Sequence, residues 1–291
     1  MATFVAIVYL YLVHNSDRVI LDQLRDEGIS IRDSRPANWT GSDHSISFEG
    51  NYTGKAARLI ARLTGRVDVR IAGHLGAPLD DLDGVNSIVS LTVSRLQHKI
   101  PMSFQNGLPN CRELILEGNE ISDDQLSFLA RCPKLQHISL DGSGAGATAA
   151  KSLTGCQQLR TASFVCTLLD DDACKSIGRI APLLNLNISG CNITDDGIMW
   201  LAQLRMVNVL NLNDTKVTGK GLRALAKCPN LEIIAAENVE VSAEELLALE
   251  DCRLLSDITI SDASAIDPDA LKTRFLVHKR WRPGIRSRPE F

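Results

Sequence analysis

The chain is poor in aromatic residues, which limits how its core can be filled and how it can recognise a partner. Phe, Trp and Tyr make up 4% of the 291 residues, although hydrophobic residues together make up 44%. Leucine, isoleucine, valine and alanine must therefore fill the core. Outside the C-terminal tail, basic and aromatic residues are not interleaved, so we expect no nucleic-acid interface.

Cysteine pairs at metal-binding spacing are also missing. The chain has eight cysteines, but no two of them form the C-x-x-C pattern typical of zinc and redox sites. Four of them recur at one position of a repeat described below: Cys132, Cys156, Cys228 and Cys252. We therefore expect reduced thiols that pack as small buried hydrophobic groups, and we expect no metal or other cofactor.

The N-terminal segment, residues 1–13, is apolar but short. Residues 2–13 read ATFVAIVYLYLV, whereas a membrane-spanning helix needs roughly 20 apolar residues. A secretory signal would need a positively charged start, and no basic residue precedes this run. Two interpretations stay open: the end of a truncated membrane anchor, or a buried cap. The first implies association with a membrane and the second a cytoplasmic protein, so the sequence leaves the location undetermined.

Charge is concentrated at the C-terminus. The formal net charge is −4, yet residues 272–291 contain seven Lys or Arg and one Glu. Such a tail can contact nucleic acid or acidic lipid, but a solvated end that keeps the terminus soluble is the simpler interpretation.

A repeat of 24 residues organises most of the chain. It has the pattern LxxLxLxxNxI, typical of leucine-rich repeats. Seven units follow in strict register, beginning at Cys111, Leu135, Leu159, Leu183, Val207, Leu231 and Leu255. Three weaker strand pairs precede them: Ile46/Phe48, Val69/Ile71 and Leu91/Val93. The sequence therefore predicts ten strands.

Two of the units show the resemblance most clearly. CRELILEGNEISDDQLSFLARC and LLNLNISGCNITDDGIMWLAQL resemble the cysteine-containing and bacterial types of leucine-rich repeat. The resemblance implies an α/β solenoid, or horseshoe, of about ten repeats of 22–24 residues. Its parallel strands would form a concave sheet and its helices would line the convex side. It also implies protein recognition but names no partner.

Each unit contains a strand followed by a helix. Side chains alternate along a strand, so both leucines of the LxL pair point inward. The helical halves begin after good N-cap residues in five units: Ser122, Asp170, Thr194, Thr218 and Ser242. Ser242 and Glu245 have the spacing of a capping box. A further helix is expected over Ser16–Gly28, an edge strand over Ile29–Ile31, and a closing segment over Phe275–Val277.

These patterns predict four regions. Residues 1–13 are the apolar segment, 14–45 an N-terminal cap, 46–271 the solenoid and 272–291 the basic tail.

Two motifs resemble ligand-binding sites, but their residues are better explained by their positions in the repeat. Gly142, Gly144 and Ala147 follow a strand and open a helix, as in a dinucleotide-binding turn. The strand spacing of 24 residues is shorter than the ~30 residues of such a unit. The acidic runs 123–124, 170–172 and 195–196 could suggest a cation, but they stand at helix starts, where the helix dipole favours negative charge.

We therefore expect a non-catalytic, monomeric module that binds a protein or peptide on its concave face. His137 and Ser139 share that face, but nothing completes a catalytic triad. The residues expected to bind the partner are Arg112, Glu113, Glu117, Gln136, His137, Asp141, Arg160, Asn187 and Asn211. The alternative is a structural spacer or display domain that residues 1–13 hold at a membrane.

Overall fold

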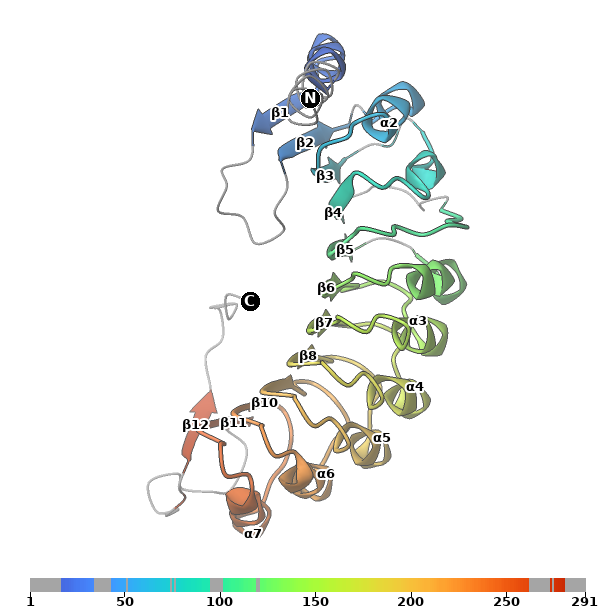
Figure 1. Ribbon diagram of the computed structural model, residues 1–291. Helices are drawn as coiled ribbons and strands as arrows, with labels where there is room; N and C mark the ends of the chain where they lie inside the picture. Colours follow the sequence, from blue (N-terminus) through green and yellow to red (C-terminus); the bar gives the residue numbers. More distant parts are fainter. Residues whose placement is uncertain are drawn as a thin grey trace, which may run out of the picture. The chain divides into compact units, whose positions relative to one another are not determined.

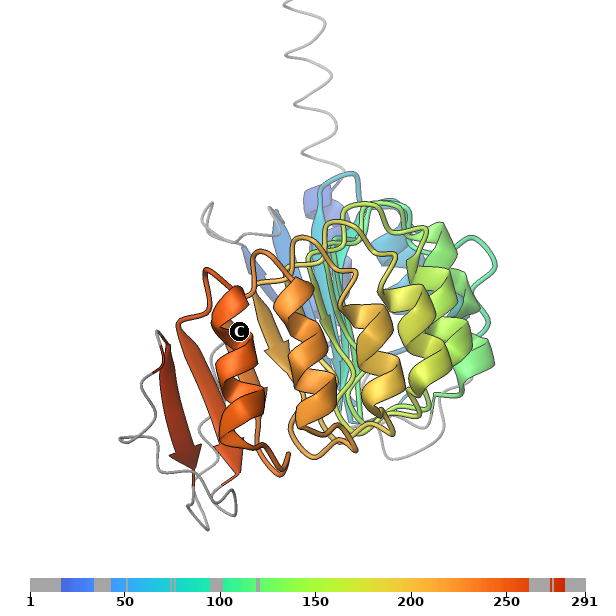
Figure 2. The same cartoon turned by 90° about the horizontal axis from the view of Figure 1, so that it is seen from below.

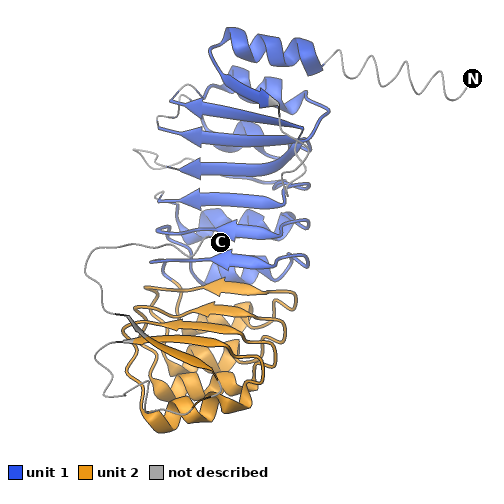
Figure 3. Cartoon of the chain, turned by 90° about the vertical axis from the view of Figure 1, so that its left-hand side faces the viewer, with its two compact units in different colours: residues 1–168 blue, residues 169–291 orange. Residues whose placement is uncertain are grey.

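The computed structural model describes residues 17–33, 43–50, 52–73, 75, 77–94, 102–118, 121–261, 273 and 275–280. The chain divides into two compact units, residues 1–168 and 169–291 (Figure 3). The apolar segment 1–13, the expected N-cap Ser16 and most of the basic tail lie outside the described residues. None of the described helices has the length and apolar composition that a membrane crossing requires.

Unit 1 contains a sheet whose strands follow one another in chain order. Its strands are β1 (Ser30–Asp33), β2 (His44–Glu49), β3 (Val67–Ala72), β4 (Ile88–Ser94), β5 (Glu113–Glu117), β6 (His137–Ser139) and β7 (Thr161–Ser163). From β2 onward the neighbours pair in parallel. β1 is the expected edge strand, displaced by one or two residues, and it pairs antiparallel to β2. Only ten residues separate these two strands, fewer than a parallel crossover needs.

Unit 2 continues the same construction. Its strands are β8 (Asn185–Asn187), β9 (Val209–Asn211), β10 (Ile233–Ala236), β11 (Asp257–Ser261) and β12 (Leu276–Arg280). All neighbouring pairs among them are parallel. The ten predicted strands are β2 to β11, and β1 and β12 add one strand at each end of the series.

The helices of each unit lie on one side of its sheet (Figures 1 and 2). In unit 1 they are α2 (Gly54–Ala61), η1 (Leu79–Leu82), η2 (Asp123–Arg131) and α3 (Ala147–Leu153), and a further helix over residues 17–26 lies at the end of the stack (Figure 1). In unit 2 they are α4 (Asp171–Ile177), α5 (Asp195–Leu201), α6 (Gly219–Ala224), η3 (Leu225–Lys227), α7 (Ala243–Leu247) and η4 (Ala248–Asp251). The η elements are 3-10 helices.

The helix starts follow the predicted caps. The side chains of Asp170, Thr194, Thr218 and Ser242 each accept a hydrogen bond from a backbone N–H in the first turn. The predicted capping box of Ser242 and Glu245 is present. These bonds satisfy N–H groups that have no partner within the helix.

The core lies between each sheet and its helices. The paired leucines of the strand, such as Leu114 and Leu116, are 0% exposed, and so are Leu126 and Leu129 of η2. Fully burying one such side chain contributes about 1.5–3 kcal/mol. No single repeat encloses its apolar face, so each depends on its neighbours in the stack.

Seven of the eight cysteines belong to this core. Among the described residues all eight are free thiols, and only Cys166 is exposed. The thiols of Cys156 and Cys252 donate to the carbonyl oxygens of Leu129 and Leu225, each at 3.3 Å. These carbonyls belong to the preceding repeat, so the thiols link adjacent repeats. Burial raises the pKa of Cys156 to about 12.

The N-terminal helix caps unit 1. Asp17 is 6% exposed and accepts hydrogen bonds from the backbone N–H groups of Thr64 and Gly65, at 3.0 and 2.8 Å. The helix ends at Asp26, and Gly28 follows it with a φ of +75°, a left-handed conformation that favours glycine. The sequence predicted this stop.

Candidate functional site

The outward side of strands β2 to β7, which we call the unit 1 face, carries three rows of side chains. Each row crosses the strands in register. The first contains Ser45, Asp68, Ser90, Glu113, His137 and Thr161. The second contains Ser47, Arg70, Thr92, Ile115, Ser139 and Ser163. The third contains Glu49, Ala72, Ser94 and Glu117. Most members are polar, which is expected of a sheet side that no helix covers.

Hydroxyl groups bind carboxylates along the first row. The Ser45 hydroxyl donates to Asp68 Oδ2 at 3.2 Å, and the Ser90 hydroxyl donates to Glu113 Oε2 at 2.9 Å. An Arg70 guanidinium nitrogen lies 2.9 Å from Asp68 Oδ2. Partial burial raises the pKa of Glu113, and the nearby Asp68 carboxylate raises it further.

The other two predicted carboxylates on this face also join neighbouring strands. Glu117 Oε1 accepts from the Ser139 hydroxyl at 2.9 Å. Asp141 Oδ1 accepts from the Ser163 hydroxyl at 2.7 Å and from the backbone N–H of Val165 at 2.8 Å. In each carboxylate, one oxygen is therefore held in place by a serine hydroxyl of the next strand.

Arg112, Gln136 and Arg160 lie directly before β5, β6 and β7 rather than in the rows. Each backbone N–H bonds the preceding repeat: the N–H of Arg160, for example, donates to Gln136 O at 2.8 Å. The Arg160 side chain is exposed. Burial lowers the pKa of His137, and the positive charge of Arg160 lowers it further. The sequence placed these residues on the face itself, whereas the structure places them at its edge.

The predicted asparagines lie on the sheet of unit 2. Asn187 Oδ1 accepts from the backbone N–H of Ser189 at 3.1 Å, and Asn211 Oδ1 accepts from that of Asn213 at 3.0 Å. Side-chain amides commonly hold a turn two residues ahead in this way. Both asparagines therefore shape the turn after their strand.

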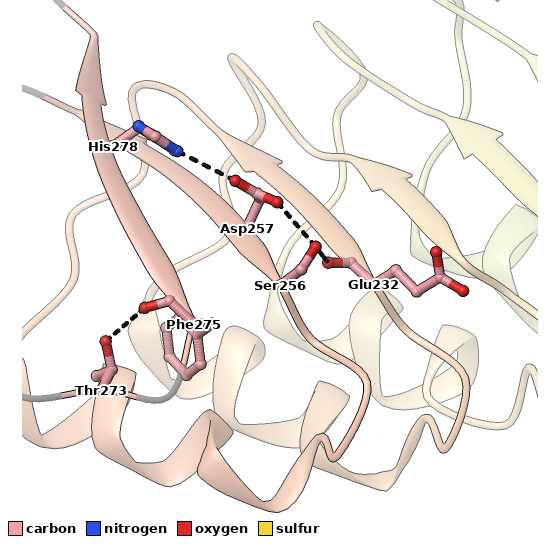
Figure 4. Close-up of polar contacts among 6 residues, drawn as sticks. All are labelled: Glu232, Ser256, Asp257, Thr273, Phe275 and His278. Atoms are coloured by element: carbon pink, nitrogen blue, oxygen red, sulfur yellow. Dashed lines mark hydrogen bonds and ion pairs between the residues drawn. The ribbon is translucent and has the colours of Figure 1, made fainter.

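A chain of polar contacts crosses β11 and β12 in unit 2 (Figure 4). His278 Nε2 lies 3.1 Å from Asp257 Oδ1, and the Ser256 hydroxyl lies 2.8 Å from Asp257 Oδ2 and 3.1 Å from Glu232 O. In a hydrolytic triad the histidine contacts the serine, because it removes the serine proton. Here Asp257 stands between them. The contacts therefore hold β12 against β11, and they do not activate a nucleophile.

The acidic runs act on the helix side. Asp123 accepts hydrogen bonds from the backbone N–H groups of Gly146, Thr148 and Ala149, each at 2.8 Å. Asp171 and Asp195 accept in the same way from Thr194 and Thr218, at 2.8 and 2.7 Å. Each carboxylate thus binds the helix start of the next repeat. Among the described residues, no group of three or more potential ligands is placed to hold a metal ion.

The same contacts account for the motif that resembles a dinucleotide-binding turn. A bound phosphate in such a turn sits at the helix N-terminus. At the start of α3 the Asp123 carboxylate takes that position. Gly144 serves the stacking of repeats, because a Cβ there would lie 2.7 Å from Ile121 O.

Sequence reasoning missed two members of the first row. Asp68 is 4% exposed and Ser90 is 1% exposed. Both precede the inward residue of a weaker upstream strand pair, at the position that Glu113 occupies in β5. Carrying the repeat columns back into these units would have identified them.

Comparison with known proteins agrees with this fold. A family model described as "Leucine Rich repeat" matches residues 181–202 and 203–226. No curated protein sequence matches the chain. The solved structure of PEPR1–AtPEP1 has a TM-score of 0.54 and 18% identity, and the match covers 85% of this chain. This chain spans only 38% of the length of that protein.

A second solved structure is internalin C2 from Listeria monocytogenes str. 4b F2365. It has a TM-score of 0.44 and 19% identity, and the match covers 60% of this chain and 72% of that one. The repeat period, the parallel strands with their helices and the family match over residues 181–226 together show that the chain has a leucine-rich-repeat fold.

Proposed function

We propose that this chain is a non-catalytic interaction module that binds a protein or peptide on the unit 1 face. The observation that carries the proposal is a stack of parallel strands with outward rows of polar and charged side chains. Sheets of this kind are the usual binding surface of repeat proteins. The fold alone does not fix function, so the proposal rests on the residues of the face.

The proposed contacts in unit 1 are Glu113, Glu117, His137 and Asp141, with Arg112, Gln136 and Arg160 at the edge. Carboxylates whose oxygens are already fixed by neighbouring hydroxyl groups need little reordering when a partner binds. Such preorganisation lowers the entropic cost of association. Asn187 and Asn211 are proposed as contacts on the sheet of unit 2, and each would use the amide nitrogen that the turn leaves available.

The test is affinity capture from native lysate with three baits. One bait is the wild type, and the second combines Arg112→Ala, Glu113→Gln, His137→Ala and Arg160→Ala. The third is a helix-side control of the same charge change, and it combines Asp124→Asn, Arg131→Ala and Lys151→Ala, which are all exposed residues.

We expect a partner that the wild type and the control capture and that the face variant loses. Equal capture by all three baits would contradict the assignment of the unit 1 face. Thermal unfolding of each bait checks that the variants remain folded.

A further inference from the structure

The first row of the unit 1 face contains two carboxylates on either side of a buried serine. Asp68 of β3, Ser90 of β4 and Glu113 of β5 are aligned in register. The register shifts between Val67 and Asp68, and such bulges often re-aim a side chain near a binding site. We call Asp68 and Glu113 the acidic pair.

One oxygen of Asp68 has no hydrogen-bond partner in the part of the chain that the structure describes. Its Oδ2 contacts the Ser45 hydroxyl and Arg70, but Oδ1 is buried and accepts no hydrogen bond. The residue as a whole is 4% exposed. A carboxylate oxygen that is removed from water and left unpaired is unfavourable. This atom therefore favours an additional hydrogen-bond donor.

Glu113 adds a second, more accessible carboxylate. It is half-buried, and among the described residues its side chain accepts a hydrogen bond from the Ser90 hydroxyl. Burial and the charge of Asp68 both raise its pKa, so the two negative charges act on each other. Arg70 contacts Oδ2 of Asp68 directly and its positive charge also acts on Glu113, but neither Oδ1 of Asp68 nor the Glu113 carboxylate forms an ion pair among the described residues.

We propose that the acidic pair binds an arginine or lysine side chain of an extended peptide segment in the partner. The inference rests on the proposed function and specifies its chemistry. Adjacent strands lie about 4.8 Å apart, so the two residues of the pair are roughly 10 Å apart along the row. A guanidinium group with five donors can bond both carboxylates. A calcium ion would need about six to eight oxygen ligands, more than two carboxylates and one hydroxyl supply.

Fluorescence anisotropy with a labelled peptide, Gly-Arg-Ser-Arg-Gly, tests the inference. A matched peptide carries citrulline in place of arginine, which keeps the shape and removes the charge. The variants are Glu113→Gln, which changes a half-exposed side chain, and Asp68→Asn. The control is Asp124→Asn, which makes the same charge change on the helix side of the same unit.

We expect the wild type and the control to prefer the arginine peptide, and Glu113→Gln to weaken its binding about tenfold, as expected for loss of a charged hydrogen bond. No preference for arginine over citrulline in the wild type would overturn the inference. Equal weakening of peptide binding by Asp124→Asn would show that only the net charge of the protein matters, and it would also overturn the inference. Competition by calcium alone would assign the pair to a metal ion instead.

The failure of this inference is distinguishable from that of the proposed function. If lysate capture is lost in the four-residue face variant but kept in Glu113→Gln and Asp68→Asn, the partner binds the face without the acidic pair. In that case the proposed function stands and the basic-peptide inference does not.

Discussion

Replacing Asp123 with alanine should weaken the contact between two adjacent repeats of unit 1 and lower the free energy of unfolding. Its carboxylate accepts hydrogen bonds from the N–H groups of Gly146, Thr148 and Ala149, each at 2.8 Å. A hydrogen bond to a charged group contributes about 1.5–3 kcal/mol. The site is partly exposed and water can replace part of this, so we expect a loss of about 2–4 kcal/mol for the three together.

Asp124→Ala is the matched control. Asp124 is exposed, adjacent in sequence and equally charged, so its replacement should cost about 0.3–1 kcal/mol through the helix dipole alone. Urea unfolding followed by circular dichroism measures both variants. Hydrogen exchange at residues 146–149 then shows whether the opening is local. Equal destabilisation by the two variants would refute the reasoning.

The same contact predicts a dependence on pH. Burial acts to raise the pKa of Asp123, but hydrogen bonds from the backbone N–H groups of Ala149, Thr148 and Gly146 outweigh it and hold the pKa below the ordinary value of an aspartate. A lowered pKa in the folded state gives stability that is present above the unfolded pKa and is lost as the pH falls through the folded pKa. The difference between wild type and Asp123→Ala should therefore shrink below about pH 4.

Two further predictions concern packing between repeats. Gly221→Ala places a Cβ against the Asp195 carboxylate and 2.9 Å from Val217 Cγ1. We expect this crowding to destabilise the fold by about 1–3 kcal/mol, although alanine favours helices by about 1 kcal/mol. A raised melting temperature would contradict the close approach. Iodoacetamide should modify only Cys166 in the folded chain, because the other seven cysteines are buried. Mass spectrometry of the intact protein should show one adduct before unfolding and eight after it. Early modification at several cysteines would contradict their burial.

The strands were predictable because the same inward positions recur in every unit, so each unit supports the assignment of the others. The LxL pair recurs in seven units with a period of 24 residues, and one register error would turn every leucine outward. The antiparallel β1 was not predictable from this pattern. Its direction depends on the turn at Gly28 and on a short connection, neither of which belongs to the repeat.

The candidate site was predictable only in part. The sequence identified Glu113 and His137 by their column, but it gave Arg112 and Arg160 a place in the rows. The strands begin one residue later, at Glu113 in β5 and Thr161 in β7. The sequence also could not show that Asp68 Oδ1 lacks a hydrogen-bond donor among the described residues, because that depends on which neighbouring groups reach the atom in space.

Photo-crosslinking from the unit 1 face tests the central claim most directly. A photoreactive amino acid replaces Ile115 in the second row of β5, and in a separate variant it replaces Lys151, which is exposed on α3. We predict that the partner identified by capture forms an adduct from position 115 and not from position 151. An adduct from position 151 alone would contradict the account and would place binding on the helix side.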